Sequence, residues 1–123
     1  MYGLIRNFEK RFGPQYLQRG REYYQQGLGK SIVRDKNLVT AQVEGNSLYR
    51  VGIDLDSGAM SCTCPFEDNC KHMAAVLYAL RANKEVDANK LFAPLKEKQK
   101  EELEEIIRLM VLEDPELAIY MNP

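Results

Sequence analysis

The chain has 123 residues, of which 45% are hydrophobic and 28% charged, enough for one domain with a modest core. No apolar run approaches the length of a membrane span, and the first residues do not form a signal peptide. The net charge of −1 hides an asymmetry, because residues 1–50 carry a net +5 and residues 51–123 a net −6. This split indicates a face for nucleic acid or an acidic partner in the first half, although solvated helices also carry such charges.

Two helices are predicted before residue 27. Apolar residues recur at spacings of three and four over residues 4–12, which favours a short helix. Gly13-Pro14 breaks it, and Pro14 is suited to open a second helix over about 15–26. Gly27 is its expected C-cap. The buried stripe of the second helix should hold Tyr16, Leu17, Tyr23 and Tyr24.

Three short strands are predicted between residues 29 and 55. The first lies around 29–35, and the next two show apolar residues alternating with polar ones, as in a half-buried strand. Turn residues separate the three, so the pattern predicts an antiparallel meander with one apolar and one wet face. A sheet of this size is not stable alone. We expect the helices of 15–26 and 71–82 to cover its apolar face.

All three cysteines and the single histidine lie within eleven residues: Cys62, Cys64, Cys70 and His72. Three thiolates and one imidazole are a complete tetrahedral set for structural zinc. In an extended chain Cys62 and Cys64 face one side. Cys70 and His72 can share that ion only if Cys70 precedes a helix and His72 lies in its first turn. We therefore predict one structural Zn²⁺ between a strand end and a helix N-terminus, whose N–H groups keep the thiolates charged.

A core cluster, a disulfide and a catalytic nucleophile each fit these four residues less well. Buried core side chains need not gather in one stretch. A disulfide would be strained between Cys62 and Cys64 and would leave one cysteine over. A Cys–His nucleophile would leave two cysteines without a role. Glu67 or Asp68 could replace one ligand, but a loop acid is more commonly solvated.

The motif resembles the SWIM-type zinc finger. The likeness rests on Cys62-x-Cys64-Pro65, a five-residue gap at the short end of the pattern, and Cys70-Lys71-His72 followed by Met-Ala-Ala-Val-Leu. Over about residues 10–82 the flanks are similar to the region leading into that finger in bacterial Swi/Snf-type helicase-like ATPases. The resemblance implies a module that binds DNA or protein partners beside a catalytic domain, with no activity of its own.

The expected fold class is α+β: a small three-stranded antiparallel meander with packed helices and a zinc-bound strand–loop–helix, followed by C-terminal helices. We expect a zinc finger domain over 1–83 and a helical extension over 84–123 that packs on it or on a following domain. Within the extension, residues 96–112 form an amphipathic pattern. Asp114-Pro115 is suited to start a last short helix.

The expected function is a non-catalytic zinc-binding module that binds DNA through a basic face, by phosphate contacts, as an accessory region of a helicase-like ATPase. The residues expected to make them are Arg34, Lys36, Arg50 and Lys71. No stacking motif for single strands is evident, because most tyrosines fall on apolar stripes. The alternative is a protein-interaction module that docks a helicase core or another partner. Four ligands close the zinc shell, so we expect no enzyme and no small-molecule substrate. Reduced cysteines point to the cytoplasm, and no membrane partner is expected.

Overall fold

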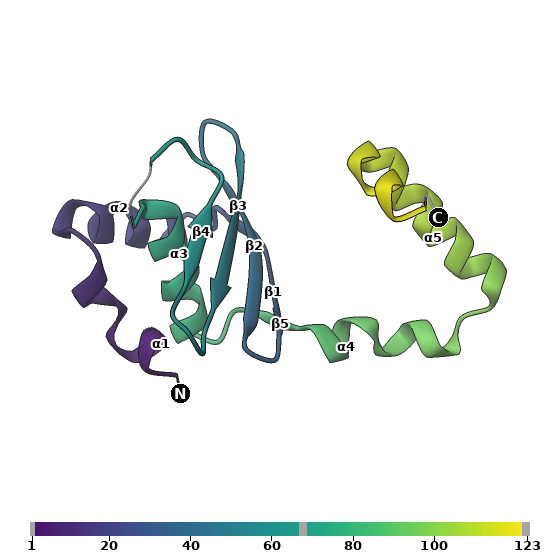
Figure 1. Cartoon of the computed structure of the whole chain (residues 1–123), viewed down its shortest axis with the longest axis horizontal. Helices are drawn as coiled ribbons and strands as arrows, with labels where there is room; N and C mark the ends of the chain where they lie inside the picture. The colour runs from purple at the N-terminus through teal and green to yellow at the C-terminus, as the bar shows by residue number, and fades with distance from the viewer. Residues whose placement is uncertain (1, 67–68, 122–123) are drawn as a thin grey trace. The chain divides into compact units, whose positions relative to one another are not determined.

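The computed structural model describes residues 2–66 and 69–121. It divides into two compact units, Met1–Asn89 and Lys90–Pro123. The fold class is α+β, as predicted: a sheet and its helices form the first unit, and helices alone form the second (Figure 1).

The N-terminal helices follow the sequence pattern with one difference. The helix expected over 4–12 is split into α1 (Gly3–Asn7) and the 3₁₀ helix η1 (Phe8–Arg11). Asn7, with φ −127° and ψ 24°, lies outside the helical region, and this interrupts the helix. The second helix, α2 (Pro14–Gln25), opens with the proline at its first position. It ends before Gly27, whose φ of +71° is easily adopted by glycine.

The sheet contains the predicted meander and two further strands. β1 (Gly29–Asp35), β2 (Leu38–Glu44) and β3 (Leu48–Asp54) pair antiparallel in sequence order. β4 (Met60–Cys62) extends the β3 edge, and β5 (Val86–Asp87) pairs parallel with β1. The sheet is therefore mixed and five-stranded, in the order β4-β3-β2-β1-β5, rather than three-stranded. Strands of three and two residues are too short to show an alternating pattern.

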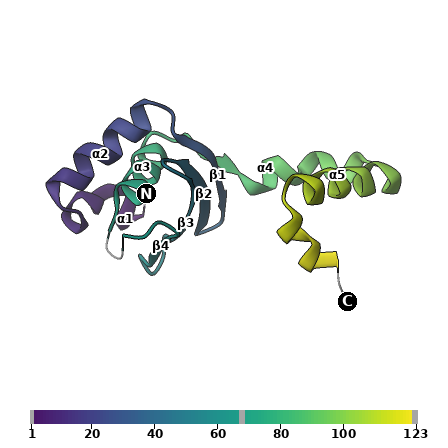
Figure 2. The ribbon, with the colours of Figure 1, turned by 90° about the horizontal axis from the view of Figure 1, so that it is seen from above.

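The sheet and two helices form three successive layers. α3 (Lys71–Arg81) packs against β1 to β4, and α2 packs chiefly on α3, so α3 lies between α2 and the sheet (Figure 2). The expectation that α2 would cover the sheet directly is therefore corrected. Because α3 is enclosed on both sides, every residue from His72 to Leu80 is buried. A helix that is apolar all round is suited to this central place.

The second unit has helices, and none of its residues from 90 to 121 is buried. The chain passes through α4 (Ala88–Phe92) and the 3₁₀ helix η2 (Ala93–Glu97) to α5 (Lys100–Glu113) and the 3₁₀ helix η3 (Pro115–Met121). A capping box formed by Gln99 and Glu102 begins α5. Neither α5 nor η3 contains a buried residue. Within the described residues, every helix is too short or too polar to cross a membrane.

Candidate metal centre

The four predicted ligands come from a strand end, a turn and the start of a helix. Cys62 is the last residue of β4 and pairs with Val51, so its side chain faces the side of the sheet that α3 covers. Cys64 follows in the turn. Cys70 is the N-cap of α3, with extended backbone at φ −99° and ψ 168°. His72 lies in the first turn, which is the arrangement that its spacing from Cys70 requires.

The ligand atoms converge on one point. One atom from each of Cys62, Cys64, Cys70 and His72 lies within 4.8 Å of all the others. Cys62 Sγ and His72 Nδ1 are 3.7 Å apart. Ligand atoms of a tetrahedral zinc lie roughly 3.4–3.8 Å from one another, so a small contraction suffices. All three cysteines are free thiols. The donor set and its spacing fit one structural zinc ion held by two thiolates from the strand side, one from the helix cap and one imidazole.

Cys70, the N-cap of α3, is the cysteine most easily converted to a thiolate. Its pKa is lowered to about 4, because the Cys62 side chain donates a hydrogen bond to it, with further hydrogen bonds from His72 and the Met73 backbone N–H. The same contact and partial burial raise the pKa of Cys62. Because zinc is held by thiolates rather than thiols, loading this site would release the protons that the three cysteines still carry.

Comparison with known protein families gives a match for the segment that carries the four candidate ligands. Residues 49–81 match the family model of the SWIM zinc finger. That segment is a SWIM zinc finger. An uncharacterized protein of Methanocaldococcus jannaschii is 35% identical over 102 residues, which cover 82% of this chain and 44% of the relative. The chain thus spans less than half the length of that relative. No solved structure matches the chain significantly.

The histidine of the SWIM finger is enclosed by aromatic rings. The His72 ring lies 4.5 Å from the Tyr49 ring and 5.5 Å from the Tyr23 ring, between centroids. Its Nδ1 faces Cys62, whereas its buried Nε2 has no hydrogen-bond partner among the described residues. The β2–β3 turn closes over this nitrogen, since a Cβ at Gly45 would lie 3.3 Å from Nε2 and 3.0 Å from the Tyr49 ring. Packing therefore fixes the ring so that Nδ1 is the nitrogen that a metal could reach.

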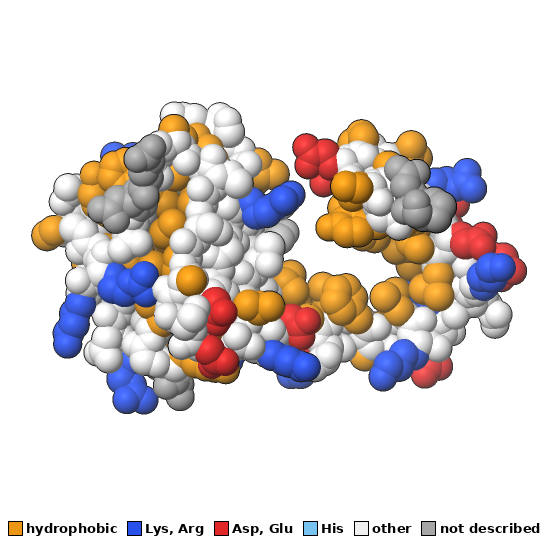
Figure 3. Space-filling model, in the orientation of Figure 1, with side chains coloured by type: hydrophobic (Ala, Val, Ile, Leu, Met, Phe, Trp, Pro, Cys, Tyr) orange, Lys and Arg blue, Asp and Glu red, His pale blue; other side chains and the backbone are white. Residues whose placement is uncertain are grey.

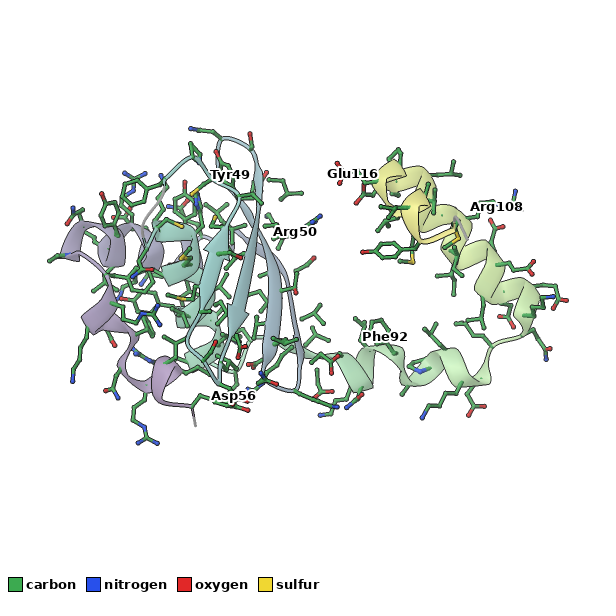
Figure 4. The ribbon with its side chains drawn as sticks, viewed as in Figure 1. Tyr49, Arg50, Asp56, Phe92, Arg108 and Glu116 are labelled. Atoms are coloured by element: carbon green, nitrogen blue, oxygen red, sulfur yellow. The ribbon has the colours of Figure 1, made fainter. Side chains whose placement is uncertain are left out.

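The cations predicted to contact DNA lie in three places. Arg34 pairs with buried Val39 and so lies on the α3 side of the sheet, where its Nε donates to Lys36 O at 2.9 Å. Lys36 lies in the β1–β2 turn with φ +58°. Arg50 lies on the open face, because its neighbour Tyr49 points toward the finger and the two side chains diverge from β3 (Figure 4). Lys71 opens α3 between two ligands. Of these four residues, only Arg34 and Lys36 lie close to each other.

An aromatic hollow beside the finger was not predicted. A cavity of about 210 Å³ is lined by three ligands of the finger and by side chains from α2, β3, the start of α3 and three loop positions. Its aromatic members come from three stretches that are 26 and 17 residues apart in the chain, so no local pattern signals it. Glu67 and Asp68, considered as substitute ligands, lie outside the described residues. The described lining is Tyr16, Tyr23, Asn46, Tyr49, Cys64, Pro65, Phe66, Cys70, Lys71 and His72.

Proposed function

We propose that the Met1–Asn89 unit is a non-catalytic module, stabilised by zinc, that binds DNA through its phosphates. The proposal rests on the lack of a salt bridge at Lys71 and Arg50 among the described residues. Among residues 2–66 and 69–121 neither forms a salt bridge, whereas Lys30, Arg34 and Arg81 each have an acidic partner. A cation without a carboxylate partner keeps its full charge for a phosphate.

Lys71 is held in place more firmly than an ordinary surface lysine. It is half-buried at the first position of α3, and its ammonium lies 5.3 Å from the centroid of the Tyr23 ring. The zinc, when bound, supplies only a structural clamp, because four protein donors fill its shell. Clamping the start of α3 also fixes the backbone that carries Lys71. The finger thus positions a cation beside the metal without any chemical step.

The four predicted cations should contribute unequally. Arg34 lies 3.9 Å from Glu85 and stacks 5.3 Å from the Tyr2 ring, so part of its charge is already compensated. Arg50 is exposed on the open sheet face, and Lys36 projects from a turn at one end of the sheet. We therefore rank Lys71 and Arg50 first among the phosphate contacts and Arg34 last.

The test is the affinity of the zinc-loaded chain for DNA across a salt series. Lys71→Ala and Arg50→Ala should each lower the affinity for DNA by a factor that is the same for every DNA sequence. Each should also reduce the magnitude of the slope of log K against log salt by about 1. Lys30→Ala is the matched control, because that lysine lies 3.3 Å from Glu44. An affinity that does not depend on salt, or no binding at low salt, would rule out the proposal.

A second function, protein docking, is favoured by the Lys90–Pro123 unit. Seven of its large apolar side chains beyond residue 100 are 42% to 77% exposed, and hydrophobic side chains gather along this unit in Figure 3. Exposed apolar surface of this extent marks interaction sites. We propose that it docks a helicase-like ATPase domain. Leu112→Ser, at a side chain 72% exposed, should then weaken binding to such a domain in calorimetry and leave DNA binding unchanged. The seven are Ile107, Leu109, Met110, Leu112, Ile119, Tyr120 and Met121.

A further inference from the structure

The hollow beside the SWIM finger has two aromatic walls. On one side the rings of Tyr16 and Phe66 lie 4.8 Å apart at an angle of 46°. On the other side Tyr23 and Tyr49 flank His72. The three tyrosines are half-buried, and Phe66 is 41% exposed, so each keeps ring surface that a ligand can reach. Accessible aromatic rings around a hollow can serve as a platform on which a planar ligand stacks.

Polar groups at the hollow suit a nucleotide. Lys71 places its ammonium over Tyr23, and Asn46 supplies an exposed amide from the β2–β3 turn. An amide can both donate to and accept from a base edge, and an ammonium attracts the phosphate that accompanies each base.

The size of the hollow limits what it can hold. At about 210 Å³, a volume that three of the four metal ligands also border, it is smaller than the 300–1,000 Å³ typical of sites for drug-sized ligands. One planar ring system therefore fits better than an extended ligand. A base inside a duplex cannot reach such a hollow, because it is stacked on both faces.

We propose that this hollow binds one unstacked base of a single-stranded nucleic acid, with the adjoining phosphate on Lys71. The inference rests on the proposed function and deepens it, since it names the strand form and the site. A base is favoured over an aromatic or proline side chain of a peptide, because Lys71 has no acidic partner among the described residues and carries the charge that a phosphate requires. Peptide binding becomes an outcome of the test.

The first experiment uses the fluorescence of the chain itself. The protein has seven tyrosines and no tryptophan, so a base stacked in the hollow should quench a signal that comes from tyrosine alone. We expect a thymidine decanucleotide to bind the zinc-loaded full chain at least tenfold more tightly than the matching duplex, with quenching. Equal affinities without quenching would overturn the hollow as a base site, while salt-dependent binding to both would leave the phosphate proposal standing.

The second experiment locates the base. Phe66→Ala and Tyr16→Ala should each weaken single-strand binding by about tenfold, because stacking on one aromatic ring is worth that much or more. Phe92→Ala and Tyr120→Ala, at aromatic residues 54% and 77% exposed elsewhere, should change nothing. Zinc content and the melting temperature of each variant check that the finger is intact.

Two results would overturn the inference even with an intact finger. The first is unchanged single-strand affinity in both Phe66→Ala and Tyr16→Ala. The second is quenching by a phenylalanine- or proline-containing peptide but not by the oligonucleotide, which would assign the hollow to a protein ligand. If Phe66→Ala fails to retain zinc, single-strand affinity is measured instead for the more conservative Phe66→Leu. Leucine fills the space of the phenylalanine without offering a ring on which a base can stack.

Discussion

Gly20 of α2 lies so close to Ala74 of α3 that a Cβ built on Gly20 would be 2.5 Å from the Ala74 Cβ. It would also lie 3.0 Å from the backbone oxygen of Lys71 and 3.1 Å from the backbone nitrogen of Ala75. Two of these three atoms belong to the backbone of α3, which cannot yield as a flexible side chain can. The approach of α2 to the metal-binding end of α3 therefore depends on a residue without a side chain.

Gly20→Ala should accordingly destabilise the chain. Alanine is the better helix former by about 1 kcal/mol, but forcing the two helices apart costs about 1–3 kcal/mol. Because the collision reaches Lys71, between two ligands, zinc affinity should fall as well. Chemical denaturation and a competitive chelator titration measure both effects. Gly3→Ala is the matched control, since nothing lies within 4 Å of its added Cβ, and equal stability of the two variants would contradict the packing argument.

Zinc removal should unfold at least residues 56–82. The ion joins the end of β4 to the start of α3, and structural zinc contributes on the order of 10 kcal/mol in small domains, comparable to a whole domain's stability. A chelator, or Cys64→Ser, should lower the melting temperature and expose the amides of α3 to hydrogen exchange. The control is the same chelator saturated with zinc beforehand. Melting that is unchanged by the free chelator would show that the metal is not structural.

Stability should also depend on pH through Glu9 and Arg81. Two hydrogen bonds from Arg81, at 2.6 and 2.7 Å, hold the pKa of Glu9 at about 2, below its ordinary 4.5. Since the folded pKa is the lower one, the pair stabilises the fold above about pH 4.5 and loses this effect as the pH falls toward 2. Glu9 is 44% exposed, so solvent screening limits the contribution to about 1 kcal/mol or less.

Glu9→Gln tests this dependence. The difference in unfolding free energy between the wild type and the variant should be largest near pH 6 and should vanish toward pH 2. Comparing the two proteins at each pH removes the effect of zinc release in acid, which both share. A difference that stays constant with pH would mean that the Glu9 charge adds nothing to the contact.

The close packing of the β2–β3 turn on His72 gives a further expectation. A Cβ at Gly45 would lie 3.0 Å from the Tyr49 ring and 3.3 Å from His72 Nε2, so Gly45→Ala should displace the imidazole. We expect zinc affinity to fall by about tenfold or more, as is typical when the surroundings of a ligand are disturbed. Asn46→Ala, the next residue of the same turn, should leave zinc affinity unchanged. If Gly45→Ala binds zinc as tightly as the wild type, the turn does not fix the position of His72.

The sequence by itself determined the three long strands, most of the helices and the candidate metal ligands, because all of these depend on neighbours along the chain. The alternation and turns predicted β1 nearly to the residue and two further strands after it in an antiparallel meander, and the two pairs of ligands predicted a strand end and a helix start on either side of one ion. These features are local: a turn, a cap and a spacing of two need no knowledge of distant residues.

Only the tertiary structure decided which distant segments meet. It added β4 and β5, which exist because β3 and β1 offer open edges, and it placed α2 on α3 rather than on the sheet. It separated Arg50 from Lys71, and it gathered Tyr16, Tyr49 and Phe66 around one hollow. Tyrosine stripes that look like ordinary core in sequence become a lined cavity only when three segments pack, and that packing depends on contacts between residues far apart in the chain.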